Sequence, residues 1–332
     1  MRRVRVTILI IILLLPTVLS GCTQKPEEKD HPISVVCTIF PQYDWVRSIV
    51  GDKLNNMNLT LLLNSRIDLH NYQPSVNDIV TISSCDLFIY IGGESDGWVD
   101  DVLKQAVNKN MVVIKLLDTL GDAAKTEETI EGMEDEDNKE HGGGHDDEAD
   151  YDEHIWLSLK NAQVFCAVIA DALSALDKGH AEVYQSNTSA YIAQLSALDL
   201  NYQAALTTSS EAPAYTQTLL FGDRFPFRYL IDDYGLNYYA AFAGCSAETE
   251  ASFKTIIFLA EKMNELGLKN VMVTESSDKK IAETIIRESK GDARQILVLD
   301  AMQSVNKSDI SNGVTYLSIM ESNLNILKEA LK

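Results

Sequence analysis

Basic residues are scarce in this chain of 332 residues. It has 28 lysines and arginines against 49 aspartates and glutamates, which gives a formal net charge of −21 at pH 7. Such an excess of negative charge argues against nucleic acid and anionic membrane surfaces as partners, and it favours a cation. With 45% hydrophobic residues, the chain can still bury a sizeable core, and its length predicts two lobes.

Cysteine is also sparse, with five residues and no C-x-x-C pair. Cys37, Cys85 and Cys166 lie inside apolar runs, whereas Cys245 does not. This pattern favours small buried side chains over a disulfide framework. Cys37 and Cys85, each on an expected strand, are the one pair for which a disulfide remains open.

Hydrolase motifs are absent as well. The sequence contains neither H-E-x-x-H nor G-x-S-x-G. Glu153, directly before His154, is the only candidate for a general base beside a metal ligand, and we expect it to support that histidine instead. We therefore expect a binding protein and not an enzyme.

The first 22 residues have the pattern of a lipoprotein signal. Three arginines precede an apolar run over residues 6–18, which ends in Leu-Ser-Gly-Cys at Cys22. The run is shorter than the ~20 residues of a spanning helix, and its flanks are those of a secretory signal. The ending resembles the bacterial lipobox, so we expect residues 1–21 to be removed and Cys22 to be lipidated at the outer face of the cell membrane. Residues 22–32 are polar with two prolines and predict a flexible tether.

Short apolar runs alternate with helical stretches in two blocks of the chain. Continuous apolar strands between helices indicate parallel sheets covered on both faces, so two α/β lobes are expected. The expected strands are residues 34–40, 59–63, 85–92 and 111–116, then 218–221, 238–242, 270–274 and 295–299. The expected helices of these blocks are residues 43–50, 76–83, 98–108, 253–265 and 281–288.

Between the two blocks, residues 163–176 and 181–206 are apolar at helical spacing. Large apolar side chains recur every three, four or seven residues in the second stretch, which predicts one helix with a buried stripe. We expect this helix to connect the lobes and to restrict hinge motion. The predicted organisation is an N-terminal metal-binding lobe over residues 33–180, a connecting helix over 181–208 and a C-terminal metal-binding lobe over 209–332.

Residues 121–153 interrupt the pattern of the first lobe. Acidic residues and three consecutive glycines dominate this stretch, which holds too few apolar residues to fold. We expect a disordered loop. Because it also carries His141 and His145, it is typical of a weak, multidentate collector of metal ions. A merely solvated acidic loop is the alternative.

Five polar residues follow the predicted strands or the acidic stretch. In open α/β sheets, ligands bind beyond the carboxyl ends of the strands. The residues are His70, His154, Asp223, Glu275 and Asp300. Taken singly, each histidine could be structural and each carboxylate could cap a helix or pair with a neighbouring arginine. Their placement at equivalent positions in both lobes predicts a metal site in the cleft.

Six short motifs carry a resemblance to a known family. They are residues 36–41 (VCTIFP), 68–74 (DLHNYQP), 86–90 (DLFIY), 153–158 (EHIWLS), 244–250 (GCSAETE) and 323–325 (NLN). The mature chain resembles, over nearly its whole length, the solute-binding lipoproteins of bacterial zinc and manganese ABC transporters, the cluster A-I metal-binding proteins. The resemblance implies two (β/α)4 lobes joined by one long helix, a metal in the cleft and an ABC permease as partner. We also expect a monomer.

The resemblance implies ligands at several positions of this chain. His70 and His154 match the first two ligands of the family. Asp300 matches the fourth, and Glu275 is a nearby reserve.

The third ligand is less regular. The family has a His or Glu there, in a motif like His-Asp-Ala-Phe-x-Tyr. An ungapped match places Arg224 at that position, and a one-residue gap places Gly222 there. Neither side chain binds zinc, so we predict Asp223 as the third ligand.

Two imidazoles and two carboxylates suit zinc and also suit manganese. The order of affinities favours zinc for a mixed nitrogen and oxygen site, and the resemblance makes an acidic, histidine-containing loop typical of zinc members. We predict a receptor that captures zinc in the cleft and delivers it to the permease. The alternatives are a manganese receptor of the same type and, less favoured, a surface adhesin or metal store.

Overall fold

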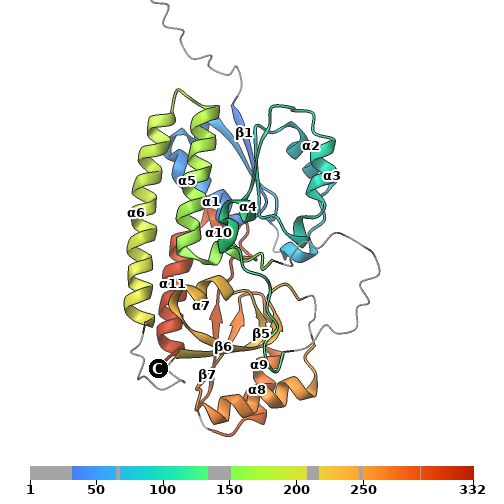
Figure 1. Ribbon diagram of the computed structural model, residues 1–332, viewed down its shortest axis with the longest axis vertical. Coiled ribbons are helices and arrows are strands. Elements are labelled where there is room, and N and C mark those ends of the chain that lie inside the picture. The colour runs from blue at the N-terminus through green and yellow to red at the C-terminus, as the bar shows by residue number, and fades with distance from the viewer. Residues whose placement is uncertain (1–31, 65–67, 134–150, 208–216, 247–249, 292) are drawn as a thin grey trace, which may run out of the picture.

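The computed structural model describes residues 32–64, 68–133, 151–207, 217–246, 250–291 and 293–332. Within them the chain forms two lobes, each built on a four-stranded parallel sheet (Figure 1). The first sheet has the order β2-β1-β3-β4, with β1 (Ile33–Cys37), β2 (Met57–Leu61), β3 (Leu87–Tyr90) and β4 (Val112–Lys115). The second has the order β6-β5-β7-β8, with β5 (Thr218–Phe225), β6 (Asn237–Ala243), β7 (Asn270–Thr274) and β8 (Gln295–Leu299). The predicted α/β fold with two parallel sheets is confirmed.

Helices link successive strands in both lobes. Those of the first lobe are α1 (Phe40–Val50), α2 (Val76–Ser84), α3 (Val99–Lys104) and α4 (Leu116–Leu120). Short 3-10 helices stand at η1 (Gly51–Asn56), η2 (Leu69–Asn71), η3 (Glu94–Asp96), η4 (Gly121–Ala123) and η5 (Ile155–Leu157). Those of the second lobe are α7 (Arg228–Tyr234), α8 (Phe253–Glu265), α9 (Lys280–Glu288) and α10 (Lys307–Ser311).

Three long helices form a layer along one side of both sheets (Figure 1). They are α5 (Leu159–Leu176), α6 (Ala181–Leu206) and the C-terminal α11 (Tyr316–Ala330). Helix α6 contacts α5, α1 and α11. The stripe predicted on it is buried: Tyr184, Tyr191, Leu195, Leu198, Tyr202 and Leu206. Helix α5 is long and apolar enough to cross a membrane by length and composition, but one face of it, which includes Phe165, Ile169 and Leu173, is buried in the core.

The lobes share one continuous core. A single buried cluster contains Trp45 and Phe165 of the first lobe together with Phe221 and Leu299 of the second. Helix α11, which the sequence assigned to the second lobe, packs on α1 and α6 as well as on β8.

Hydrogen bonds tie the lobes together within this core. The indole N–H of Trp156 donates to the carbonyl of Ala301 at 2.9 Å, and the Tyr316 hydroxyl donates to the carbonyl of Trp156 at 2.7 Å. Dense interiors resist deformation, so this arrangement is consistent with the expected restriction of hinge motion, which stays a prediction.

The two ends of the acidic stretch are ordered, unlike the loop predicted over residues 121–153. Thr126 pairs with Tyr151 in an antiparallel bridge. Lys125 Nζ lies 2.8 Å from a carboxylate oxygen of Asp232 in α7. Glu128 forms an ion pair with Arg228, which is also in α7. Ion pairs with the second lobe therefore hold residues 121–133 in place. Residues 134–150, with His141 and His145, lie outside the described residues.

The cysteines of the described residues are free thiols. Cys37, Cys85 and Cys166 are buried, as expected of small apolar side chains, and Cys245 is half-buried. The sulfur of Cys85 lies 3.4 Å from the sulfur of Met111. Cys37 and Cys85 therefore do not form the disulfide that the sequence left open.

The buried stripe of α6 predicts a difference between two leucines of that helix. Leu195 is fully buried, whereas 62% of Leu200 is exposed. Replacing Leu195 by alanine leaves a cavity in the shared core and should destabilise the metal-free protein by about 2–5 kcal/mol. Leu200→Ala should change the stability by no more than about 0.5 kcal/mol. Urea unfolding followed by circular dichroism measures both, and equal losses would contradict the packing of α6.

Candidate metal centre

His70 lies in η2, two residues after Asp68, which caps this short helix. The Asp68 carboxylate accepts hydrogen bonds from the backbone N–H of His70 at 3.1 Å and from its ring Nδ1 at 2.6 Å. An Nδ1–H that donates to a carboxylate leaves the lone pair on Nε2. That Nε2 is buried and has no hydrogen-bond partner among the described residues. His70 is therefore oriented as a metal ligand with its outer-shell carboxylate already in place.

His154 repeats this arrangement at the end of the acidic stretch. Asp152, two residues before it, accepts from the backbone N–H of His154 at 2.8 Å and from Nδ1 at 2.9 Å. The His154 ring is fully buried, and its centroid lies 5.3 Å from that of His70. Its Nε2 faces the side-chain nitrogen of Gln303 at 2.9 Å, and we assign the amide N–H as the donor because Nδ1 holds the ring proton. An incoming cation would have to displace Gln303.

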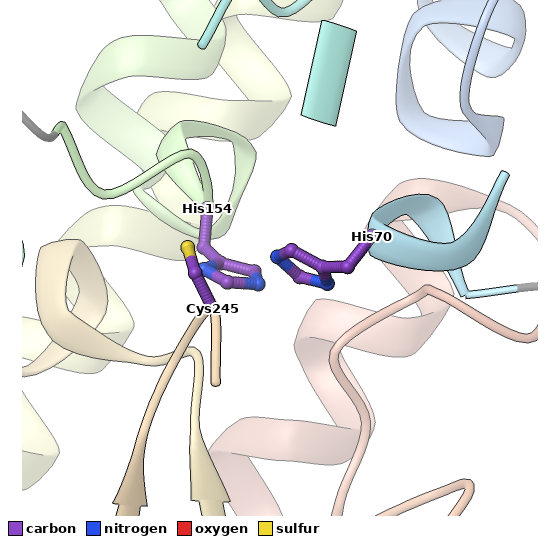
Figure 2. A group of neighbouring side chains, drawn as sticks. All are labelled: His70, His154 and Cys245. Carbon is purple, nitrogen blue, oxygen red and sulfur yellow. The ribbon is translucent and has the colours of Figure 1, made fainter. Parts of the chain in front are cut away.

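Cys245 completes the group from the second lobe. The ligand atoms of His70, His154 and Cys245 all lie within 4.8 Å of one another, and Figure 2 shows the sulfur beside the His154 ring. Cys245 follows β6, and the close approach requires Gly244, where a Cβ would lie 3.2 Å from two atoms of the His154 ring. The backbone N–H of Cys245 donates to Glu127 at 2.7 Å. Glu127, near one end of the acidic stretch, thus helps to position Cys245.

Arg224 lies at the edge of this group. Its guanidinium donates to Asp68 at 2.5 Å and to the carbonyl of Ser246 at 3.4 Å. Burial acts to raise the pKa of Asp68, but the hydrogen bond from His70 and the charge of Arg224 outweigh it and lower that pKa well below its usual value. Asp68 therefore stays ionised. The same carboxylate orients His70 and forms an ion pair with Arg224.

Burial shifts the pKa values of three other groups in the centre. It lowers the pKa of His154, despite the opposing effect of Asp152, so this imidazole is neutral at pH 7. It raises the pKa of the Cys245 thiol well above its ordinary value, and nearby carboxylates add to the effect. It also raises the pKa of Glu153 to about 7. Because thiolate is the ligand form of cysteine, a bound cation must displace the Cys245 proton.

Asp223 does not fit the predicted role of third ligand. The sequence placed it after a strand, but β5 continues to Phe225, with a shift in register between Phe221 and Arg224. One Asp223 oxygen accepts from the backbone N–H of Arg224 at 2.8 Å, and the other accepts from Thr274 N and Oγ1 at 3.0 and 2.8 Å. The Asp223 side chain therefore connects the irregular part of β5 to Thr274 of β7.

Glu275 and Asp300 follow β7 and β8, as expected, but neither belongs to the group of three ligand atoms among the described residues. Glu275 accepts from the backbone N–H groups of Ala301 and Gln303 at 2.8 Å each and so shapes the loop that carries Gln303. Asp300 accepts from Met302 N at 2.7 Å, and burial with the charge of Glu275 raises its pKa to about 7. Asp300 as the fourth ligand stays a prediction.

Sequence reasoning missed Cys245 as a candidate ligand. Two signals were available: it is the one later cysteine outside an apolar run, and it lies within the 244–250 motif. Its distance from both histidines in the sequence hid the contact. Only the fold brings the end of β6 to the residues that follow the acidic stretch.

The family described as "Zinc-uptake complex component A periplasmic" matches residues 35–330 of this chain. The chain belongs to that family. Zinc-binding protein AdcA of Streptococcus pyogenes is 29% identical over 302 residues, covering 89% of this chain and 55% of that protein. High-affinity zinc uptake system protein ZnuA of Bacillus subtilis is 28% identical over 305 residues, covering 92% of this chain and 89% of that protein. The crystal structure of the Zn(II)-bound ZnuA-like domain of Streptococcus pneumoniae AdcA has a TM-score of 0.68 at 26% identity, covering 90% of this chain and 98% of that one.

These matches confirm the family that the six motifs indicated, and they confirm its two-lobed fold. The chain spans only 55% of the length of the streptococcal relatives, whereas it covers most of the Bacillus protein.

The contact between Gln303 and His154 predicts that removing this amide strengthens cation binding. Gln303→Ala frees His154 Nε2 of a hydrogen bond with a net value of about 1 kcal/mol, so zinc affinity should rise roughly fivefold. Gln295→Ala, at an exposed residue of β8, is the control. Competition with a fluorescent zinc chelator measures both variants. A weaker affinity of Gln303→Ala would show that the amide helps to hold the ion.

Proposed function

We propose that this chain is the extracytoplasmic receptor of an ABC importer, which captures Zn²⁺ between its lobes and presents it to a membrane permease. One observation carries the proposal: two buried histidine rings, each oriented by an aspartate, bring their ligand atoms within 4.8 Å of each other and of the Cys245 sulfur. The names of the related zinc-binding and zinc-uptake proteins support it. Nothing in this arrangement calls for a chemical reaction, so we propose binding and release, not catalysis.

Zinc is the cation that this donor set favours. Imidazole and thiolate are typical zinc ligands, whereas manganese is suited by carboxylate, carbonyl and water. The sequence had left manganese open because it predicted two carboxylates and no sulfur. Replacing the predicted Asp223 with Cys245 moves the choice further toward zinc.

The N-terminal part of the proposal rests on the sequence. Cys22 would carry the lipid, residues 22–32 would form the tether, and the protein would then stay near its permease at the membrane. His141 and His145, with the carboxylates around them, would raise the local concentration of cations near the centre. Support comes from the bridge between Thr126 and Tyr151, which attaches this stretch directly beside His154.

Calorimetry and cobalt spectroscopy on the mature chain test the proposed site. We expect one tight zinc site per chain, which loses several kcal/mol of binding free energy in His70→Ala and His154→Ala because a small ligand shell loses a member. The cobalt-loaded protein should show a thiolate-to-cobalt charge-transfer band. Cys245→Ser should abolish the band, whereas Cys166→Ser, in the core and away from the site, should keep it. Wild-type affinity in both histidine variants would contradict the site.

Deleting residues 136–148 tests the role of the acidic stretch while keeping the ordered ends that hold Cys245. Loading at scarce zinc should become slower, because fewer negative charges attract the cation, and the difference should shrink above ~0.1 M salt. The equilibrium dissociation constant should stay within a few-fold of wild type. Stopped-flow loading, with a Gly/Ser segment of equal length as control, measures this. Loss of the tight site would show that the stretch supplies ligands.

A further inference from the structure

Glu153 presents a buried carboxylate oxygen to the metal centre. One of its oxygens, Oε1, accepts from the backbone N–H of Ser95 at 2.7 Å. The other, Oε2, is buried and has no hydrogen-bond partner among the described residues. It lies 3.9 Å from His70 Nε2, which is also buried and without such a partner. Two unpartnered ligand atoms thus face the same space.

In the first lobe, the backbone at Gly93 and Ser95 accommodates the Glu153 carboxylate. Gly93 has a φ of +133°, and a Cβ there would lie 2.5 Å from Glu153 Oε1 and 2.8 Å from its Cγ. Only glycine leaves room for the Glu153 side chain, because this conformation also disfavours other residues. The Ser95 N–H then fixes one oxygen, so the orientation of the other is not accidental. A buried acceptor without a partner is costly to the fold, and such a group calls for an explanation.

The distance between the two atoms fits a shared cation better than a hydrogen bond. Hydrogen bonds to nitrogen or oxygen have lengths of about 2.7–3.2 Å. Two ligand atoms on one tetrahedral zinc, each about 2.0–2.2 Å from the ion, stand roughly 3.3–3.6 Å apart. The observed 3.9 Å between Glu153 and His70 is close to this range. Glu153 lies outside the group of three, so its carboxylate must also move toward His154 and Cys245 when the cation binds.

We propose that Glu153 is a ligand of the bound cation, joining His70, His154 and Cys245. This inference rests on the proposed function and names a ligand that neither the sequence analysis nor the group of three includes. Charge supports it: a thiolate and a carboxylate together neutralise a divalent ion. Asp68 cannot supply that charge alone, because it already pairs with Arg224.

Glu153→Gln and Glu153→Ala test the assignment. Each should weaken zinc binding by more than about 100-fold, which exceeds the ~10–100-fold typical of losing a partner outside the ligand shell. The d–d spectrum of the cobalt-loaded protein should also change. The unfolding midpoint of metal-free Glu153→Gln should stay the same or rise, because the variant removes a buried carboxylate. Glu94→Gln, which removes the same charge from an exposed residue of η3, should leave affinity and spectrum unchanged.

The outcomes separate this inference from the proposed function. If wild-type protein binds zinc tightly while both Glu153 variants bind it equally well with an unchanged cobalt spectrum, Glu153 is not a ligand and the receptor proposal stands. A zinc-bound crystal structure with Asp300, and not Glu153, within ~2.5 Å of the ion would overturn the inference in the same way. If wild type itself has no tight zinc site, the proposed function fails.

Discussion

Two carboxylate–imidazole hydrogen bonds orient the histidines of the candidate metal centre. Asp68 and Asp152 each stand two residues before a histidine, and each binds both the backbone N–H and the Nδ1 of that histidine. These bonds fix the ring and its tautomer, so both Nε2 lone pairs are aimed before a cation arrives. Preorganisation of this kind reduces the cost of binding, because little freedom remains to be lost.

Arg224 is a positively charged residue at the edge of the candidate metal centre, where it pairs with Asp68. In the ungapped match to the family, Arg224 stands at the position of the third ligand, and a second cation beside a bound cation would weaken binding. Its ion pair with Asp68 compensates its charge and also stabilises the ionised carboxylate that orients His70. Cys245, which follows the neighbouring strand β6, brings its sulfur to the two histidines. In the proposed site, this sulfur takes the place of the third ligand that the resemblance implies.

The shared core ties the candidate metal centre to both lobes. Trp156 binds the carbonyl of Ala301, and Tyr316 binds the carbonyl of Trp156, so the segment after His154 is tied to the second lobe. Large separation of the lobes would break this core. In the loop after β8, Glu275 accepts a hydrogen bond from the backbone of Gln303, and the Gln303 amide contacts His154. The candidate site is therefore connected to both lobes and to the loop after β8.

The sequence by itself determined the alternation of strands and helices and the bounds of α6, and it predicted the two histidines that the fold brings together. These are local properties: apolar periodicity sets which face is buried, and each histidine has its orienting aspartate two residues away. The tertiary structure decided the rest. Asp223 is engaged by Thr274 because β5 runs on through a bulge, which no periodicity reveals. Cys245 and Glu153 meet the histidines because separate loops converge where both sheets end, and such contacts depend on the packing of the whole core.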